Sequence, residues 1–122
     1  MRTRFGGVGL GIAVAGAGSL LALPVYAQTI GPAETKAYVG KPVTVEAAIT
    51  DVHTARSGAT FIDMGGEFPD NEFVAVIFAD DVAKFPDASS LEGKTVTITG
   101  TVQMYQGKPE IVLKSPSQLK MK

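Results

Sequence analysis

The sequence contains no cysteine. It therefore has no disulfide, no thiol nucleophile, no cysteine-ligated zinc and no thiol redox chemistry. No lipobox cysteine follows the N-terminal segment, so we expect no lipid anchor. Without disulfides, a hydrophobic core alone has to stabilise the fold. A closed β-barrel of this size can supply such a core.

Positive charge is also scarce. The chain has 11 basic and 12 acidic residues, and two of the basic residues, Arg2 and Arg4, lie in the first 27 residues, which hold no acidic residue. Residues 28–122 therefore carry 9 basic and 12 acidic side chains, a net charge of −3. A mildly acidic domain has no global field that attracts polyanions, so nucleic-acid binding would need a local basic patch.

Catalytic motifs are absent from the sequence. There is no serine elbow and no phosphate-binding glycine loop, and Gly65-Gly66 fits a turn. The single histidine, His53, follows Asp51 by two residues, which places both side chains on one face of an extended strand. The local sequence offers no further partner, so we interpret His53 as a surface residue. We expect no enzymatic activity, no cofactor and no metal.

The first 27 residues have the pattern of an export signal. Arg2 and Arg4 give a positive start, residues 8–23 are apolar and rich in glycine and alanine, and Val25-Tyr26-Ala27 is a small-residue cleavage pattern. An uncleaved membrane anchor is the alternative, but the run falls short of the ~20 strongly apolar residues that a span needs. We expect cleavage after Ala27 and a periplasmic or secreted protein without a membrane span.

The remaining chain is rich in strand patterns. Residues 41–52 alternate, with the apolar set pointing one way: Val43, Val45, Ala47 and Ile49. Residues 60–64 form a second short strand, and the continuous apolar run 73–78 predicts a strand buried on both faces. Asp80-Asp81 then offers an N-cap and a negative first turn for a short helix over 81–85, which Pro86 ends.

A hairpin closes the pattern. Residues 95–103 alternate again, and Gln106-Gly107 fits a two-residue turn before a returning strand over 109–113. Gly100 suits a bend or bulge where a small barrel turns a corner. After Ser115-Pro116-Ser117, Leu119 and Met121 are expected to pack one last turn against the barrel.

This order predicts an all-β fold with one short helix, the five-stranded Greek-key OB-fold barrel. An SH3-type barrel is the main alternative, and the helix between the third and fourth strands favours the OB order. Residues 28–40 are interpreted as a leader and residues 41–122 as the domain, which we expect to be a monomer.

The sequence resembles small exported bacterial OB-fold modules of the nucleic-acid-binding type. The segments that carry the resemblance are residues 40–45, 60–65, 68–69, 73–78, 93–96 and 105–111. The resemblance spans almost all of the chain after residue 27 and is specific for the fold. It implies single-stranded nucleic acid as the ligand class, although OB-folds serve many functions.

OB-folds bind on the face of the second and third strands, between the loops that flank them. Single-stranded nucleic acid needs basic groups and aromatic faces there. The residues nominated for ligand binding are Arg56, Phe61, Phe73, Tyr105 and Lys108. Phe61 and Phe73 have the alternative interpretation of core residues, and Tyr105 and Lys108 are expected to lie opposite each other across the hairpin.

An acidic loop offers oxygen ligands of the kind that calcium prefers: Asp63, Glu67, Asp70, Asn71 and Glu72. Its spacing does not match an EF-hand, so we interpret the loop as a solvated turn. The alternative function is an envelope interaction module that binds a protein, a glycan or a small cationic ligand through an acidic surface. A nuclease accessory that needs a partner chain is a third possibility. Salt dependence separates nucleic acid from a protein partner.

Overall fold

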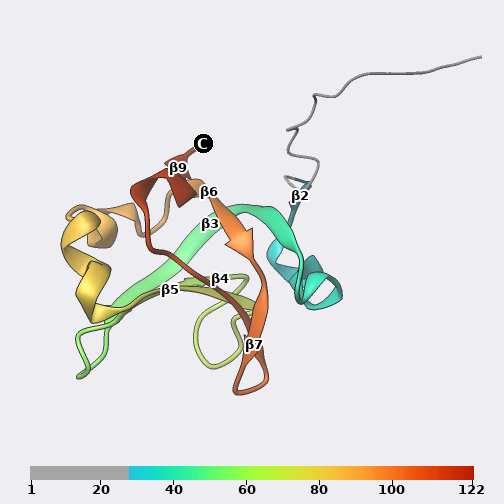
Figure 1. Ribbon diagram of the computed structural model, residues 1–122, viewed down its shortest axis with the longest axis horizontal. Coiled ribbons are helices and arrows are strands. Elements are labelled where there is room, and N and C mark those ends of the chain that lie inside the picture. Colours follow the sequence, from blue (N-terminus) through green and yellow to red (C-terminus); the bar gives the residue numbers. More distant parts are fainter. Residues whose placement is uncertain (1–27) are drawn as a thin grey trace, which may run out of the picture.

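The computed structural model describes residues 28–122, which form a β structure with short helical connections (Figure 1). The predicted export signal, residues 1–27, lies outside the described residues. The strands are β2 (Thr29–Ile30), β3 (Pro42–Thr54), β4 (Thr60–Met64), β5 (Phe73–Ile77), β6 (Thr95–Thr101), β7 (Gln103–Tyr105), β8 (Lys108–Val112) and β9 (Leu119–Met121). Four 3₁₀ segments join them: η3 (Pro32–Tyr38), η4 (Ala79–Lys84), η5 (Ala88–Leu91) and η6 (Pro116–Gln118).

The sheet has the OB-fold arrangement that the strand pattern predicts. Its strands follow the order β7-β8-β5-β4-β3-β6-β9, and β2 adds to β3. β5 and β8 are parallel, as are β2 and β3, whereas the remaining pairs are antiparallel. Val102 alone separates β6 from β7, so the predicted fourth strand turns a corner between two parts of the sheet. The hydrogen-bonded sheet itself is not closed.

The core lies between the curved faces of this sheet and confirms the inward set predicted for residues 41–52, of which Ala47 is only partly buried. Val43, Val45 and Ile49 are buried on β3, and Val96 and Ile98 are buried on β6. Burial of such side chains is the main stabilising term for a domain without disulfides. Among the described residues no helix is both long and apolar enough to span a membrane.

Position 100 requires glycine because neighbouring side chains leave no room for a Cβ atom there. A Cβ atom at this position would lie 2.5 Å from Cγ2 of Ile111 on β8 and 3.2 Å from Nε2 of Gln118. Real Cβ atoms do not approach other carbons this closely, so any side chain here would push β6 and β8 apart. The glycine thus allows two walls of the barrel to meet at the corner.

Both ends of the domain are more ordered than the sequence indicated. The sequence indicates a leader over residues 28–40, but in the structure Ile30 pairs with Val45 and is buried, and Thr35 of η3 has no exposed surface. At the other end, residues 119–121 pair with β6 as a strand, where the sequence predicted a last turn. Unpaired β-strand edges favour such additions because their backbone groups need partners.

The predicted helix at 81–85 is present as the 3₁₀ segment η4, but it begins earlier. Its N-cap is Phe78, whose backbone is extended, and no side chain caps it. The predicted N-cap at Asp80-Asp81 is therefore wrong, because β5 continues in extended form up to Phe78, whereas the predicted negative first turn is confirmed by Asp80 and Asp81. Asp81 and Lys84 instead form an ion pair of 2.8 Å, and Phe85 packs into the core. η5 follows directly, so the connection holds two short helices where one was predicted.

β3 changes partner halfway along, and its register shifts there. Residues 42–48 pair with β6 and residues 49–54 pair with β4, with one extra residue, Thr50, between the pairs Ile49–Met64 and Asp51–Asp63. Oγ1 of Thr50 lies 2.9 Å from the carbonyl oxygen of Asp63 and 2.6 Å from that of Gly66. Such a shift reverses the facing of the residues that follow it. Ile49 accordingly points into the core, whereas Asp51 points to the outer face.

Candidate functional site

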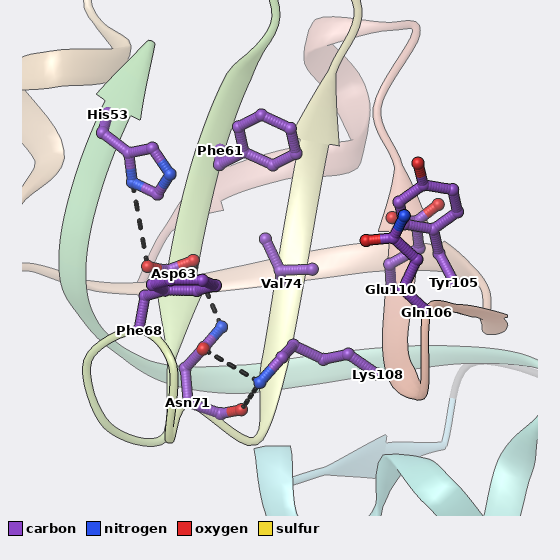
Figure 2. Close-up of a pocket in the computed structure, with 10 residues that line it drawn as sticks. All are labelled: His53, Phe61, Asp63, Phe68, Asn71, Val74, Tyr105, Gln106, Lys108 and Glu110. Carbon is purple, nitrogen blue, oxygen red and sulfur yellow. Dashed lines mark hydrogen bonds and ion pairs between the residues drawn. The ribbon is translucent and has the colours of Figure 1, made fainter. Parts of the chain in front are cut away.

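An open cleft of about 370 Å³ lies on the outer face of β4 and β5 (Figure 2). The end of β3, the 65–72 loop and the β7–β8 hairpin border it. This is the face at which OB-folds bind their ligands. The lining residues are His53, Phe61, Asp63, Phe68, Asn71, Val74, Tyr105, Gln106, Lys108 and Glu110. The term cleft refers to the space that these residues line.

Strand register brings the cleft together. Asp51 pairs with Asp63, and two residues further along β3 His53 pairs with Phe61. Asp63 in turn pairs with Val74 on β5. Residues that oppose each other across neighbouring strands project to the same face, so these side chains share one surface. The shift at Thr50 is what turns Asp51 and His53 toward it.

Aromatic rings surround the cleft. The rings of His53 and Phe61 are stacked, with centroids 5.4 Å apart and planes inclined by 21°. Phe68, on the 65–72 loop, is 70% exposed, and Tyr105, on the hairpin, is 57% exposed. Exposed large aromatic side chains that gather at a cleft are candidates for contact with a flat ligand.

Asp63 is an acidic group at the base of the cleft that water barely reaches. It is 1% exposed, and its Oδ1 accepts a hydrogen bond of 3.2 Å from Nδ2 of Asn71. Its Oδ2 is buried, has no hydrogen-bond partner within residues 28–122 and lies 3.8 Å from Nδ1 of His53. Burial raises the pKa of Asp63; His53 and Lys108 oppose this shift, while Asp51 reinforces it.

Asp51 and His53 form the outer part of this cluster. Nδ1–H of His53 donates to Oδ2 of Asp51 at 2.9 Å, and both side chains are more than a third exposed. The hydrogen bond from His53 holds the pKa of Asp51 below its usual range. Because the single Nδ1 proton serves Asp51, it leaves Oδ2 of Asp63 without a donor.

Asp63→Asn is expected to increase the free energy of unfolding at neutral pH. A carboxyl whose folded-state pKa is raised contributes fully to stability only below its unfolded pKa of about 3.9, and this contribution is lost as the pH rises through the folded value. The gain from the amide should therefore shrink toward pH ~4. The difference in free energy of unfolding between variant and parent can be measured by urea unfolding at neutral pH and at pH ~4, with a chelator present to exclude cations. Asp70→Asn, at an exposed position of the neighbouring loop, is the control. A loss of stability at neutral pH would contradict the prediction.

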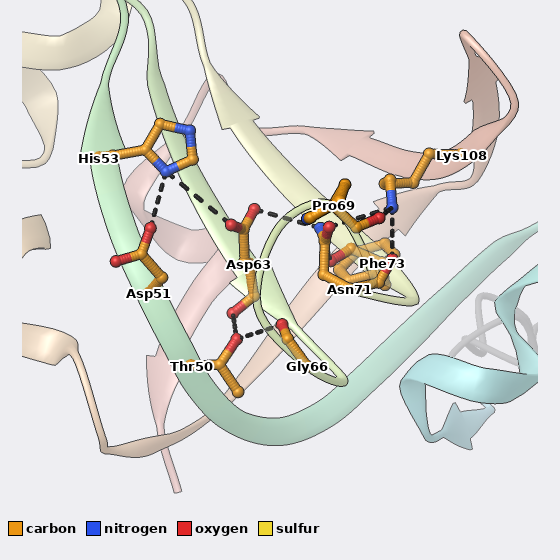
Figure 3. Close-up of polar contacts among 9 residues, drawn as sticks. All are labelled: Thr50, Asp51, His53, Asp63, Gly66, Pro69, Asn71, Phe73 and Lys108. Carbon is orange, nitrogen blue, oxygen red and sulfur yellow. Dashed lines mark hydrogen bonds and ion pairs between the residues drawn. The ribbon is translucent and has the colours of Figure 1, made fainter.

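Lys108 lies in the cleft, but its donors are used within the protein. Its Nζ donates to the carbonyl oxygen of Pro69 at 3.1 Å, to the carbonyl oxygen of Asn71, and to Oδ1 of Asn71 at 3.0 Å. A lysine ammonium has three N–H donors, so all of them are satisfied. Figure 3 shows the resulting chain of contacts from Asp51 through His53, Asp63 and Asn71 to Lys108. Lys108 thus fixes the 65–72 loop to the hairpin.

The structure places three of the five nominated residues in the cleft and two outside it. Phe61, Tyr105 and Lys108 line the cleft, and Tyr105 pairs with Lys108 as expected. Arg56 is exposed in the loop between β3 and β4 but does not line the cleft. Phe73 has no exposed surface and belongs to the core, so it offers no ring face to a base. The nomination of Phe73 as a ligand-binding residue is therefore wrong. Its alternative interpretation as a core residue is confirmed.

Several cleft residues were missed or assigned differently. Phe68 is not among the nominated residues, although its acidic neighbours Glu67 and Asp70 indicate an exposed loop. The acidic loop does not form the calcium cage considered above. Glu67, Asp70 and Glu72 are exposed, whereas Asp63 and Asn71 are buried. Among residues 28–122, the acidic and histidine side chains that converge are those of Asp51, His53 and Asp63.

Comparison with known proteins finds similarity in structure alone. No family model and no curated sequence matches the chain. A chain assigned as an aspartyl-tRNA synthetase from Leishmania major Friedlin superposes with a TM-score of 0.54 at 12% identity, over 88% of this chain and 23% of the other. The aspartyl-tRNA synthetase from Entamoeba histolytica gives 0.52 at 16% identity, over 75% and 21%.

The Stn1–Ten1 complex of S. pombe gives a TM-score of 0.51 at 14% identity, over 66% of this chain and 57% of that chain. This chain therefore spans less than two thirds of each of these structures. At such identities the likeness establishes the fold, which agrees with the OB-fold order of the strands.

Proposed function

We propose that the protein binds single-stranded nucleic acid in the cleft, by stacking of bases on aromatic rings and without catalysis. The observation that carries this proposal is the gathering of exposed rings around one cleft on the ligand-binding face of an OB-fold. The rings come from four separate parts of the chain: His53 on β3 and Phe61 on β4, which stack on each other, Phe68 on the 65–72 loop and Tyr105 on the hairpin. Every base has a π-face, so such a surface binds single strands with little sequence preference.

Similarity to known structures supports the same ligand class. Two of the structural neighbours are named as tRNA synthetases, enzymes whose substrate is a nucleic acid. The proposal also includes export, because the first 27 residues have the pattern of a cleaved signal, and it places the protein in the periplasm or outside the cell.

The electrostatics of the cleft predict an unusual salt response. The donors of Lys108 are occupied, and Asp63 and Glu110 add negative charge to the lining. The slope of affinity against salt reflects the number of phosphates that cationic groups neutralise. Few such groups are available here, so we expect a shallow slope of about 1 or less on logarithmic axes.

Binding can be measured by fluorescence anisotropy of a labelled single-stranded oligonucleotide at low and at physiological salt. Phe68→Ala and Tyr105→Ala are each expected to weaken binding by about 5–150-fold, the equivalent of about 1–3 kcal/mol for one lost stacking contact. Phe78→Ala is the matched control, because Phe78 is 49% exposed but does not line the cleft.

Two results would contradict the proposal. One is the absence of saturable binding even at low salt. The other is an equal loss of affinity in Phe78→Ala, which would show that contact is made by exposed rings in general. Either result would shift the search to the alternative function, an envelope module that binds a protein, a glycan or a cationic ligand.

A further inference from the structure

Three potential metal ligands converge beside the cleft (Figure 3). One donor atom each from Asp51, His53 and Asp63 lies within 4.8 Å of the other two. Nδ1 of His53 is 2.9 Å from Oδ2 of Asp51 and 3.8 Å from Oδ2 of Asp63. Ligands held at about 2.0–2.1 Å in a tetrahedron are separated by about 3.3 Å, a value between these two distances.

A second observation points to a cation at the same place. Oδ2 of Asp63 is buried, has no hydrogen-bond partner in the part of the chain that the structure describes, and faces His53. Asn71 fixes this orientation, since its amide donates to Oδ1 of Asp63 while its own oxygen accepts from Lys108. A buried carboxylate oxygen without a partner is unfavourable unless a donor or a cation satisfies it.

We propose that Asp51, His53 and Asp63 bind one divalent transition-metal ion, for which Zn²⁺ is the natural probe. One imidazole nitrogen and two carboxylate oxygens are a ligand set that Zn²⁺ accepts, and two carboxylates balance its charge. Calcium is disfavoured because it takes six to eight oxygen ligands. Metal binding to Nδ1 requires the tautomer of His53 that carries its proton on Nε2, so the Nδ1 proton exchanges with solvent and the imidazole stays neutral.

Three protein ligands leave at least one coordination position for water or for an oxygen of another molecule. His53 and Asp63 both line the cleft, so this position borders the space in which a ligand would lie. Asn71 and Thr50 form the outer contacts: Asn71 orients the side chain of Asp63, and Thr50 contacts its carbonyl oxygen. Such second contacts orient metal ligands in known sites.

This inference goes beyond nucleic-acid binding and does not depend on it. The test is isothermal titration calorimetry of chelator-stripped full-length protein with ZnCl₂, using an affinity tag without histidine. The expected result is saturable binding of one ion per chain. The sequence holds a single histidine, so nitrogen-correlated NMR of its imidazole reports on the site directly. Zn²⁺ should shift the Nδ1 resonance of His53, and excess Mg²⁺ should not.

Asp63→Asn and His53→Ala are each expected to abolish saturable Zn²⁺ binding. Asp70→Asn, which alters an exposed carboxylate of the neighbouring loop, should retain it. Asp63→Asn is also expected to be more stable than the parent at neutral pH, so its loss of binding cannot be attributed to unfolding. Unchanged binding in Asp63→Asn, or no shift of the His53 resonance in excess Zn²⁺, would overturn the proposal. Both measurements are made without nucleic acid. A failure of Zn²⁺ binding and a failure of nucleic-acid binding can therefore be told apart.

Discussion

Phe73→Ala is expected to lower the free energy of unfolding by about 3–5 kcal/mol, the usual range for truncation of a buried phenylalanine. Phe73 pairs with Met64 at the start of β5, has no exposed surface and is the largest fully buried side chain among the described residues. Truncation leaves a cavity in a core that no disulfide reinforces. Domains of this size are stable by only about 5–15 kcal/mol, so chemical denaturation should show a large loss.

Phe68→Ala is the matched control for this change. Phe68 lies only five residues before Phe73 but is 70% exposed. Its truncation should therefore change the free energy of unfolding by no more than about 0.5 kcal/mol. The two phenylalanines therefore have opposite expectations: one variant loses stability, and the other loses ligand affinity. Equal stability of the two variants would refute the assignment of Phe73 to the core.

Lys108→Met is expected to destabilise the protein by about 1–3 kcal/mol, because it keeps the aliphatic stem but removes all three donors. Oδ1 of Asn71 would then be left in a buried position without its partner. The 65–72 loop should loosen, and Phe68 and Asn71 should move with it. Thermal unfolding gives the loss of stability, and amide hydrogen exchange over residues 65–72 locates it.

Arg56→Ala is the control for charge, since it removes one positive charge from an exposed loop position. We expect it to leave stability nearly unchanged. If Lys108 acted mainly as a phosphate contact, Lys108→Met would leave stability unchanged and would reduce the salt dependence of binding. That pattern would contradict the structural role assigned to Lys108 here.

The sequence predicted the strands well, because their alternation and turn chemistry are local. Residues 60–64 match β4 at both ends, and the hairpin turn at Gln106-Gly107 has positive φ at both positions, as such a turn requires. The ends of the domain were harder to predict. β2 and β9 are short segments whose strand character comes from pairing with β3 and β6, and no periodicity over two or three residues can indicate that.

The candidate site was predicted only in part, for a related reason. Asp51 and His53 were correctly placed on one face, since two-residue spacing is local information. The third member, Asp63, reaches them through register with the neighbouring strand, and the extra residue at Thr50 in that register has no local sequence signal. The sequence alone therefore indicates Asp51 as a neighbour of His53 but does not indicate Asp63. The internal use of Lys108 was hidden in the same way, because its acceptors lie 37 and 39 residues away along the chain.

The extra residue at Thr50 also gives β3 an uneven tolerance to changes in length. Deletion of Thr50 would leave Ile49 and Asp51 as direct neighbours opposite Met64 and Asp63, so a regular ladder would keep both the core and the cleft in place. A deletion within residues 42–48 would instead move part of the core set to the solvent face. Homologues that vary in length along this strand should therefore gain or lose their residue at position 50.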